Sequence, residues 1–152
     1  MTKNTITKII IALVVIVAIL GGVYSLTREK IPEGSICLNY GNKKVYFQLE
    51  KMETKLYSGE TTNNAGKTKT VEGMGCTLED VLKFCKVDLS KINGVEILSS
   101  DNFSAKYEAS EISGNDKMCL LIDEDGSVFS VVFNDTYGNK RKVKNVEIIN
   151  VY

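Results

Sequence analysis

The chain has 152 residues, of which 43% are hydrophobic, and its 19 Lys plus Arg balance 19 Asp plus Glu to a formal net charge of zero. The absence of histidine excludes Ser-His-Asp and Cys-His catalysis. Arg28 and Arg141 supply the only guanidinium groups, so strong phosphate-binding forks are scarce. Residues 31–152 carry 15 Lys plus Arg against 18 Asp plus Glu, and this balance of −3 argues against a nucleic-acid binder.

The first predicted element is an uncharged apolar run of 18 residues, Ile9 to Leu26. As a helix it would be about 27 Å long, close to the thickness of the hydrocarbon core of a bilayer. A helix on the surface of a soluble core needs a polar face, and this run has none. The run therefore predicts one membrane-spanning helix, and the rest of the chain is long enough for one domain.

The charges around this run predict its orientation. Residues 1–8 carry two lysines and the α-amino group, whereas the cluster after the run nets one positive charge. The positive-inside rule places residues 1–8 in the cytoplasm, so we expect a single-pass protein of the cell membrane with its domain outside. Secretion after signal cleavage is the alternative, because Ile9–Leu20 has the length of a signal-peptide core and Val23 with Ser25 forms a small-residue cleavage site.

Residues 27–35 are polar, contain the only proline and are predicted to link the membrane segment to a domain at residues 36–152. The domain opens with two short apolar segments, Ile36–Leu38 and Lys44–Leu49. The residues between them, Tyr40–Lys43, contain a Gly-Asn pair that is typical of a tight turn. This pattern predicts a β-hairpin.

The next segment, Tyr57–Thr70, is rich in Gly, Asn, Thr and Lys and shows no apolar periodicity. It is predicted to be an exposed loop or a ragged hairpin. Within it, Asn63–Lys67 brings together backbone amides and a lysine, which are groups that can bind an anion, but it matches no phosphate-binding motif. We therefore expect this part to be solvated.

One helix is clearly predicted after that segment. Thr77 is a suitable N-cap, and two acidic residues follow it in the first turn, where the helix dipole favours anions. Apolar residues recur with the helical spacing i, i+3, i+4 and i+7. These residues are Leu78, Val81, Leu82 and Cys85. The helix is predicted to end near Lys86.

The remainder of the chain consists of short apolar runs separated by turn residues, which predicts β-strands. The predicted strands are Val95–Leu98, Phe103–Tyr107, Met118–Ile122, Val128–Phe133 and Val143–Val151. The predicted turns are Ser100–Asn102, Asp123–Gly126 and Tyr137–Asn139. The fold class is therefore α+β, a mainly β-sheet domain with one principal helix.

The four cysteines have several possible roles. Cys76 and Cys85 flank the predicted helix, which separates them by about 13 Å and prevents a disulfide between them. Cys85 lies on the apolar helix face and Cys119 lies inside the strand MCLLI, so both are expected to be small buried hydrophobes. A bridge such as Cys37 to Cys119 is the alternative. No pair of cysteines has the close spacing of a zinc site.

Two charged clusters are candidate ligand sites. Asp123–Gly126 superficially resembles a calcium loop but lacks the alternating ligands and the distal Glu of an EF-hand, so it is predicted to be a hairpin turn. The basic cluster Lys140-Arg141-Lys142, together with Lys144, can attract anionic headgroups or wall polymers, or can simply be solvated. The sequence assigns no catalytic, cofactor-binding or metal-binding residue.

Three stretches occur in an order that is found in a known family. They are Gly73–Leu82 (GMGCTLEDVL), Val95–Tyr107 (VEILSSDNFSAKY) and Gly126–Ile149, which contains Tyr-Gly-Asn-Lys. In this order they resemble the molybdopterin-binding domain of the sulfite oxidase family, especially its short bacterial versions, over residues 46–152. The resemblance implies a sulfite-oxidase-like fold for the domain.

The departures from that family bear on function. The family's molybdenum-ligating cysteine comes from the region that is Tyr57–Thr70 here, which has no cysteine, and Cys76 follows where the family has an apolar residue. Ser130 stands where the family usually has an arginine, and Asn134 where it has a proline. The resemblance thus implies the fold but argues against a molybdopterin enzyme.

Three functions are consistent with these observations. The first is a cofactor-free, non-catalytic binding module tethered outside the membrane, whose partner is a ligand, a wall polymer or another envelope protein. The second is a molybdopterin-dependent oxidoreductase that uses Cys76 as the metal thiolate. The third is a β-grasp-like ligand-binding module, because a strand pair followed by a T-L-x-D-V-L helix also suits that fold. We expect the first, which is not an enzyme and binds no nucleic acid.

Overall fold

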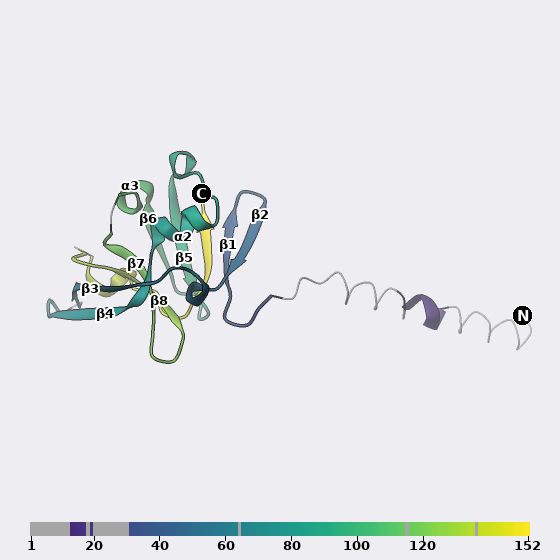
Figure 1. Cartoon of the computed structure of the whole chain (residues 1–152), viewed down its shortest axis with the longest axis horizontal. Helices are drawn as coiled ribbons and strands as arrows, with labels where there is room; N and C mark the ends of the chain where they lie inside the picture. Colours follow the sequence, from purple (N-terminus) through teal and green to yellow (C-terminus); the bar gives the residue numbers. More distant parts are fainter. Residues whose placement is uncertain (1–12, 18, 20–30, 64, 115, 136) are drawn as a thin grey trace, which may run out of the picture. The chain divides into compact units, whose positions relative to one another are not determined.

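The structure is a computed structural model, which describes residues 13–17, 19, 31–63, 65–114, 116–135 and 137–152 (Figure 1). The chain divides into two compact units, Met1–Pro32 and Glu33–Tyr152. Most of the predicted membrane segment, together with residues 1–8 and residues 27–30 of the predicted linker, lies outside the described residues. Its described part, residues 13–17 and 19, is helical with exposed apolar side chains. Among the residues that the structure describes, no helix has the length and apolar character needed to cross a membrane.

The second unit contains two β-sheets. The five-stranded sheet has the order β2 (Lys43–Phe47), β1 (Ile36–Tyr40), β9 (Val146–Val151), β5 (Gly94–Ser99) and β6 (Ser104–Glu108). The four-stranded sheet has the order β3 (Lys55–Thr62), β4 (Thr68–Thr77), β7 (Met118–Ile122) and β8 (Val128–Val132). The helices are α2 (Leu78–Phe84), α3 (Ala109–Ile112) and the 3-10 turns η1 (Leu49–Lys51), η2 (Leu89–Lys91) and η3 (Gly138–Arg141). The β1–β2 and β3–β4 hairpins lie at opposite sides of this unit (Figure 1).

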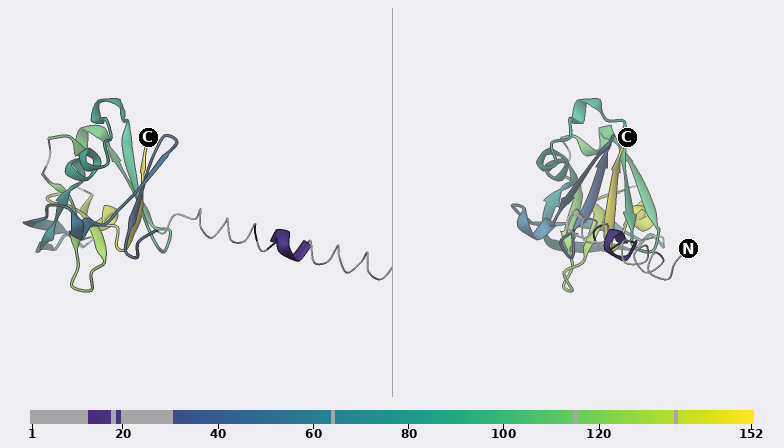
Figure 2. Two further views of the ribbon diagram at one scale, coloured as in Figure 1. Left: turned by 45° about the vertical axis from the view of Figure 1, so that its right-hand side comes forward. Right: turned by 90° about the vertical axis from the view of Figure 1, so that its right-hand side faces the viewer.

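The last strand, β9, lies in the middle of the five-stranded sheet (Figure 2, yellow). It pairs parallel with β1, where Leu38 is opposite Ile149, and antiparallel with β5, where Ile97 is opposite the same isoleucine. All three side chains are completely buried. The C-terminal strand therefore joins the N-terminal hairpin to the β5–β6 hairpin.

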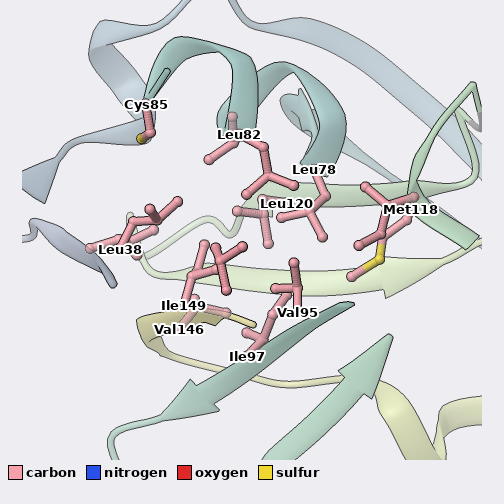
Figure 3. Close-up of a cluster of buried hydrophobic side chains, with 14 of the residues drawn as sticks. Leu38, Leu78, Leu82, Cys85, Val95, Ile97, Met118, Leu120, Val146 and Ile149 are labelled. Carbon is pink, nitrogen blue, oxygen red and sulfur yellow. The ribbon is translucent and has the colours of Figure 1, made fainter. Parts of the chain in front are cut away.

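Helix α2 closes over the main core. Thr77 caps it by accepting a 3.1 Å hydrogen bond from the backbone amide of Asp80, as the sequence predicts. Lys86, with a positive φ of 59°, follows the C-cap and turns the chain away. The buried side chains Leu78 and Leu82 converge with Leu120 of β7 and with side chains of the five-stranded sheet (Figure 3). The helix and both sheets thus share one apolar core.

The four-stranded sheet has a second, smaller apolar cluster on its other face. The strand period of two sends Leu120 of β7 into the main core and Leu121 into this cluster. The sheet also curls, because the amide of Asn134, just after β8 at one edge, donates a 2.8 Å hydrogen bond to the carbonyl of Glu60 in β3 at the other edge. The cluster is enclosed by this curl. Its members are Cys119, Leu121, Phe129, Val131 and Phe133, with Tyr57 and Val71 packed against them.

The α+β, mainly β-sheet class and the principal helix are confirmed, as are the predicted strands apart from shifts of a few residues at their ends. The segment Tyr57–Thr70 was predicted to be an exposed loop or a ragged hairpin. It belongs to a long hairpin, in which β3 and β4 pair along eight residue pairs. Helix α3 was not predicted, although Glu108 and Glu111 form a capping box around it. The turn predicted at Tyr137–Asn139 was predicted to end too early, because the 3-10 turn η3 continues to Arg141.

Candidate functional site

The candidate site consists of two neighbouring surface hollows that share Lys142 as a wall, just after η3. The first hollow, of about 320 Å³, is lined by Ser99, Asp101, Phe103, Lys142 and Lys144. The second, of about 660 Å³, is lined by residues 69–74 of β4, residues 122–124 after β7, Phe129 and Lys142. Both volumes lie in the range of small-molecule sites. The two hollows are therefore neighbours, and one lysine lines both.

Lys142 is held in place by an aromatic ring. Its Nζ lies 4.3 Å from the centroid of Phe129, a cation–π distance, and the side chain is half-buried. Burial lowers the pKa of Lys142, and the neighbouring Lys69 and Lys144 lower it further, against an opposing effect of Asp123. An anion next to Lys142 would offset this repulsion between lysines and stabilise the charged ammonium group.

The first hollow adds an acceptor and an aromatic ring. Asp101 Oδ1 accepts hydrogen bonds from Ser99 Oγ and, at 3.1 Å, from the amide of Phe103, and these bonds lower the pKa of the Asp101 carboxyl. No described protein group donates to Asp101 Oδ2, which is left as an acceptor for a ligand. The Phe103 side chain is 44% exposed and presents an apolar surface beside this carboxylate.

Arg141 is the sequence neighbour of Lys142 but belongs to a separate network. Its guanidinium donates to Asp135 at 3.0 and 2.8 Å and to Glu111 at 2.7 Å. It also stacks 4.5 Å from the ring centroid of Tyr137 and 5.1 Å from that of Tyr107. These contacts engage all three guanidinium nitrogens and two aromatic rings, so Arg141 has a structural role. In the basic cluster at residues 140–144, Lys142 and Lys144 therefore line the first hollow, whereas Arg141 lines neither hollow of the candidate site.

Ser130, which stands where the resembling family has an arginine, is also structural. It is fully buried, and its Oγ accepts a 3.0 Å hydrogen bond from the amide of Val143. The buried Tyr107 hydroxyl lies 3.4 Å from the same oxygen and donates to the carbonyl of Arg141. Burial raises the pKa of Tyr107 to about 12, so its hydroxyl stays protonated as a donor. This network fixes the chain that leads from η3 to the lysines.

Cys76, the alternative metal ligand, does not have the surroundings of a reactive thiolate. Its side chain is 2% exposed and its Sγ donates to the carbonyl of Glu53 at 3.3 Å. Burial, followed by the nearby Asp80 charge, raises the pKa of the Cys76 thiol. A molybdenum ligand must be deprotonated and accessible. The described residues therefore do not fit a molybdopterin, because the thiol is buried and neutral and the guanidinium of Arg141 is already paired.

All four cysteines carry free thiols in the structure. Cys37 is half-buried on β1, in the five-stranded sheet, whereas Cys119 points into the second cluster of the other sheet. Burial raises the pKa of Cys85 to about 11, and burial together with Asp116 raises that of Cys119 to about 12. The prediction that Cys85 and Cys119 are small buried hydrophobes is confirmed.

The other candidate sites from the sequence lie in turns. Asp123 closes the β7–β8 turn, where its amide donates to the carbonyl of Ser127 at 2.8 Å, so the hairpin prediction is confirmed. In the β3–β4 turn, Asn63 Oδ1 accepts from the amides of Ala65 and Lys67, each at 2.9 Å. Those amides are thus already bonded within the turn. In the described part of the chain, no group of three or more Cys, Asp and Glu side chains is placed to hold a metal ion.

Sequence reasoning found Lys142 and Lys144, and it named Asp123–Gly126, of which Asp123 and Glu124 line the second hollow, but it missed the other lining residues. Lys69, Phe103 and Phe129 come from β4, the β5–β6 turn and β8, which meet only in the folded domain. The one available signal was Phe103, an aromatic residue directly after a predicted turn. No protein-family model matches this chain, and no curated protein matches it significantly, so the function is inferred from the geometry of the site.

Proposed function

We propose that this chain is a non-catalytic binding module, held at the outer face of a cell membrane by Ile9 to Leu26, which binds an anionic ligand in the hollows around Lys142. The observation that carries this proposal is the half-buried Lys142 ammonium, which has Lys69 and Lys144 as neighbours in a domain of net negative charge. Burial and these two lysines disfavour the charged form of Lys142, and an anion bound beside its Nζ would stabilise that form.

The absence of enzymatic chemistry is part of the same proposal. The lysines around the hollows supply charge and hydrogen-bond donors, and Asp101 supplies an acceptor. The hollows contain no cysteine and the chain has no histidine, so Ser99 in the lining has no imidazole to activate it and no thiolate nucleophile is present there. This composition supports recognition of a ligand rather than its conversion.

The family resemblance supports a short, cofactor-free version of the sulfite-oxidase-like fold. Its three stretches correspond to the end of β4 with α2, to the β5–β6 hairpin, and to the segment from the β7–β8 turn into β9. Each stretch contributes to the lining of the hollows: Gly73 and Met74 from the first, the β5–β6 turn from the second, and Lys142 and Lys144 from the third. In this proposal the domain keeps the framework of the family and has lost the ligands of its cofactor.

The β-grasp-like module is the second candidate, and one observation favours it. Helix α2 follows the β1–β2 hairpin after the two strands β3 and β4 of the other sheet, and the final strand β9 returns to the centre of the five-stranded sheet parallel to β1. A β-grasp sheet has this arrangement of hairpin, helix and central parallel strand. Both candidates are binding modules, so the proposed function does not depend on the choice between them.

Inorganic phosphate is a suitable first probe of the proposed site. Titrated into the 15N-labelled full chain in a non-ionic detergent, it should shift the amide signals of Lys142 to Lys144, and the shifts should weaken as salt is added. Replacing Lys142 by Gln should raise the phosphate Kd about fivefold, or about 1 kcal/mol. Lys91→Gln is the matched control, because Lys91 is an exposed lysine of η2 outside both hollows, and it should leave the Kd unchanged. Equal effects of the two variants would refute the site.

A metal and pterin analysis separates the binding module from the oxidoreductase. The full chain is expressed in a host that makes molybdopterin, and molybdenum is measured by elemental mass spectrometry together with released pterin fluorescence. We expect neither in the folded protein, because Cys76 is buried and its pKa is raised. Near-stoichiometric amounts of both would contradict the proposal and make Cys76→Ser the next variant to test.

A further inference from the structure

The size of the binding surface points to an extended ligand. The two hollows measure about 320 and 660 Å³ and share Lys142 in their lining, so a molecule that occupies both contacts this lysine. A single phosphate or carboxylate would contact Lys142 and leave most of the surface empty. Resting on the proposed function above, we infer that the surface binds an acidic polysaccharide whose negative charges are separated by neutral sugars.

This inference is based on the mixture of positively and negatively charged side chains that line the two hollows. Lys142 and Lys144 stand beside Asp101 in the first hollow, and the second hollow combines Lys69 and Lys142 with three carboxylates. Those carboxylates are Glu72, Asp123 and Glu124. A polymer with a charge on every unit would meet these carboxylates and be repelled. A neutral sugar unit instead donates its hydroxyl protons to them, while an acidic unit pairs with the lysines.

Phe103 supplies the apolar contact that a sugar ring needs. Its ring is 44% exposed in the first hollow, beside Asp101 with its available Oδ2. The face of an aromatic ring carries partial negative charge and attracts the polarised C–H groups of a sugar. An aromatic face next to a hydroxyl acceptor and two ammonium groups therefore matches a sugar that bears one carboxylate.

The same features disfavour other anionic macromolecules. A single nucleic-acid strand carries one charge for about every 3.4 Å, and the mixed-sign walls oppose such a density. A lipid surface is broad and flat, so its headgroups would reach Lys144 at the rim more easily than the half-buried Lys142. A glycan chain is narrow enough to enter both hollows.

Calorimetry on the full chain in a polyoxyethylene detergent tests the inference with defined probes. A hyaluronan octasaccharide carries a carboxylate on every second sugar, a galacturonate octamer on every sugar, and an N-acetylglucosamine hexamer on none. We expect the hyaluronan octasaccharide to bind at least tenfold more tightly than the other two glycans, than inorganic phosphate and than glycerol phosphate, the soluble headgroup of phosphatidylglycerol. Tightest binding of the galacturonate octamer or of glycerol phosphate would overturn the inferred ligand class.

The outcomes also separate this inference from the proposed function on which it rests. Phosphate binding at Lys142 without binding of any glycan would leave the anion site in place and overturn the polysaccharide. Failure of every anionic probe would overturn both. Binding of hyaluronan that is unaffected by substitutions in the hollows would likewise refute the inference, because the glycan would then bind elsewhere.

Two exposed residues make variants that should fold normally. Phe103→Ser removes the ring and Lys144→Gln removes one charge, and each should raise the Kd for the hyaluronan octasaccharide about fivefold, whereas Lys91→Gln should leave it unchanged. Phe103→Ser should leave the phosphate Kd unaffected, because the ring contacts the sugar and not the anion. Lys144→Gln should weaken both ligands. A Phe103→Ser variant that binds hyaluronan normally would contradict the stacking contact.

Discussion

Replacing Gly75 by alanine is expected to lower the free energy of unfolding by about 3 kcal/mol, the upper part of the range for overpacking. Gly75 lies in β4 opposite Leu121 of β7, where the two strands pair antiparallel. A Cβ atom at this position would overlap the carbonyl oxygen of Leu120 and lie 2.9 Å from the Cα of Leu121. Both are backbone atoms, so no side-chain rotation relieves the overlap. The strands must separate at the point where the four-stranded sheet joins helix α2.

Gly73→Ala is the matched control, two residues earlier on the same strand and on the same face. There the nearest atom to a new Cβ is the Leu121 Cβ at 3.4 Å, close to an ordinary contact. Both substitutions restrict the unfolded chain equally, so the difference between them isolates the overlap in the folded state. Urea unfolding followed by circular dichroism should show a Gly73→Ala change of less than about 1 kcal/mol. Equal losses of stability would contradict the close packing of β4 on β7.

The sequence predicted those parts of the fold whose signals are local. Helix α2 was predicted from its Thr77 cap and its apolar spacing, and both appear in the structure. The strands β5 to β8 were predicted because each is a short apolar run between turn residues. In these elements the side chains that fill the core are also the ones that set the periodicity.

The β3–β4 hairpin was less certain because its tip is exposed. Most described side chains between Glu60 and Thr70 face solvent. Polar residues can therefore occupy both faces of the two strands, and the alternation of apolar and polar residues that indicates a strand is not visible. The pairing is maintained by the backbone and by the closure at Asn134, which lies far along the chain. The parallel pair β1 and β9 was not predicted for a similar reason, because its strands are more than a hundred residues apart and no local pattern encodes their pairing.

The candidate site shows the same limit at the level of single residues. Lys142 and Arg141 are adjacent and chemically similar, and nothing in the sequence indicates that Lys142 lines the candidate site while Arg141 is paired with two carboxylates. The difference depends on Glu111, which belongs to the unpredicted helix α3, and on Asp135. A cluster of basic residues in a sequence is therefore a prediction of charge, and the fold decides which of its members can meet a ligand.

Arg141→Met is expected to lower the free energy of unfolding by about 3 kcal/mol, the lower end of the range for breaking a buried ion pair. The Asp135 side chain is 6% exposed and would be left without its bidentate partner. The Glu111 side chain is 36% exposed and contributes less, because solvent screens it. Methionine also loses the stacking on Tyr107 and Tyr137. Urea unfolding at pH 7 measures the loss.

Three further variants identify the cause of that loss. Lys140→Met introduces the same side chain at an exposed neighbouring position and should change the stability by less than about 0.5 kcal/mol. Arg141→Lys keeps the charge but not the planar fork, so it should lose part of the stability. Adding Asp135→Asn to Arg141→Met should recover part of the loss, because the orphan carboxylate is then removed. If Arg141→Met and Lys140→Met were equally harmless, Arg141 would be a surface residue and would become available for an anion, which would extend the binding surface beyond Lys142.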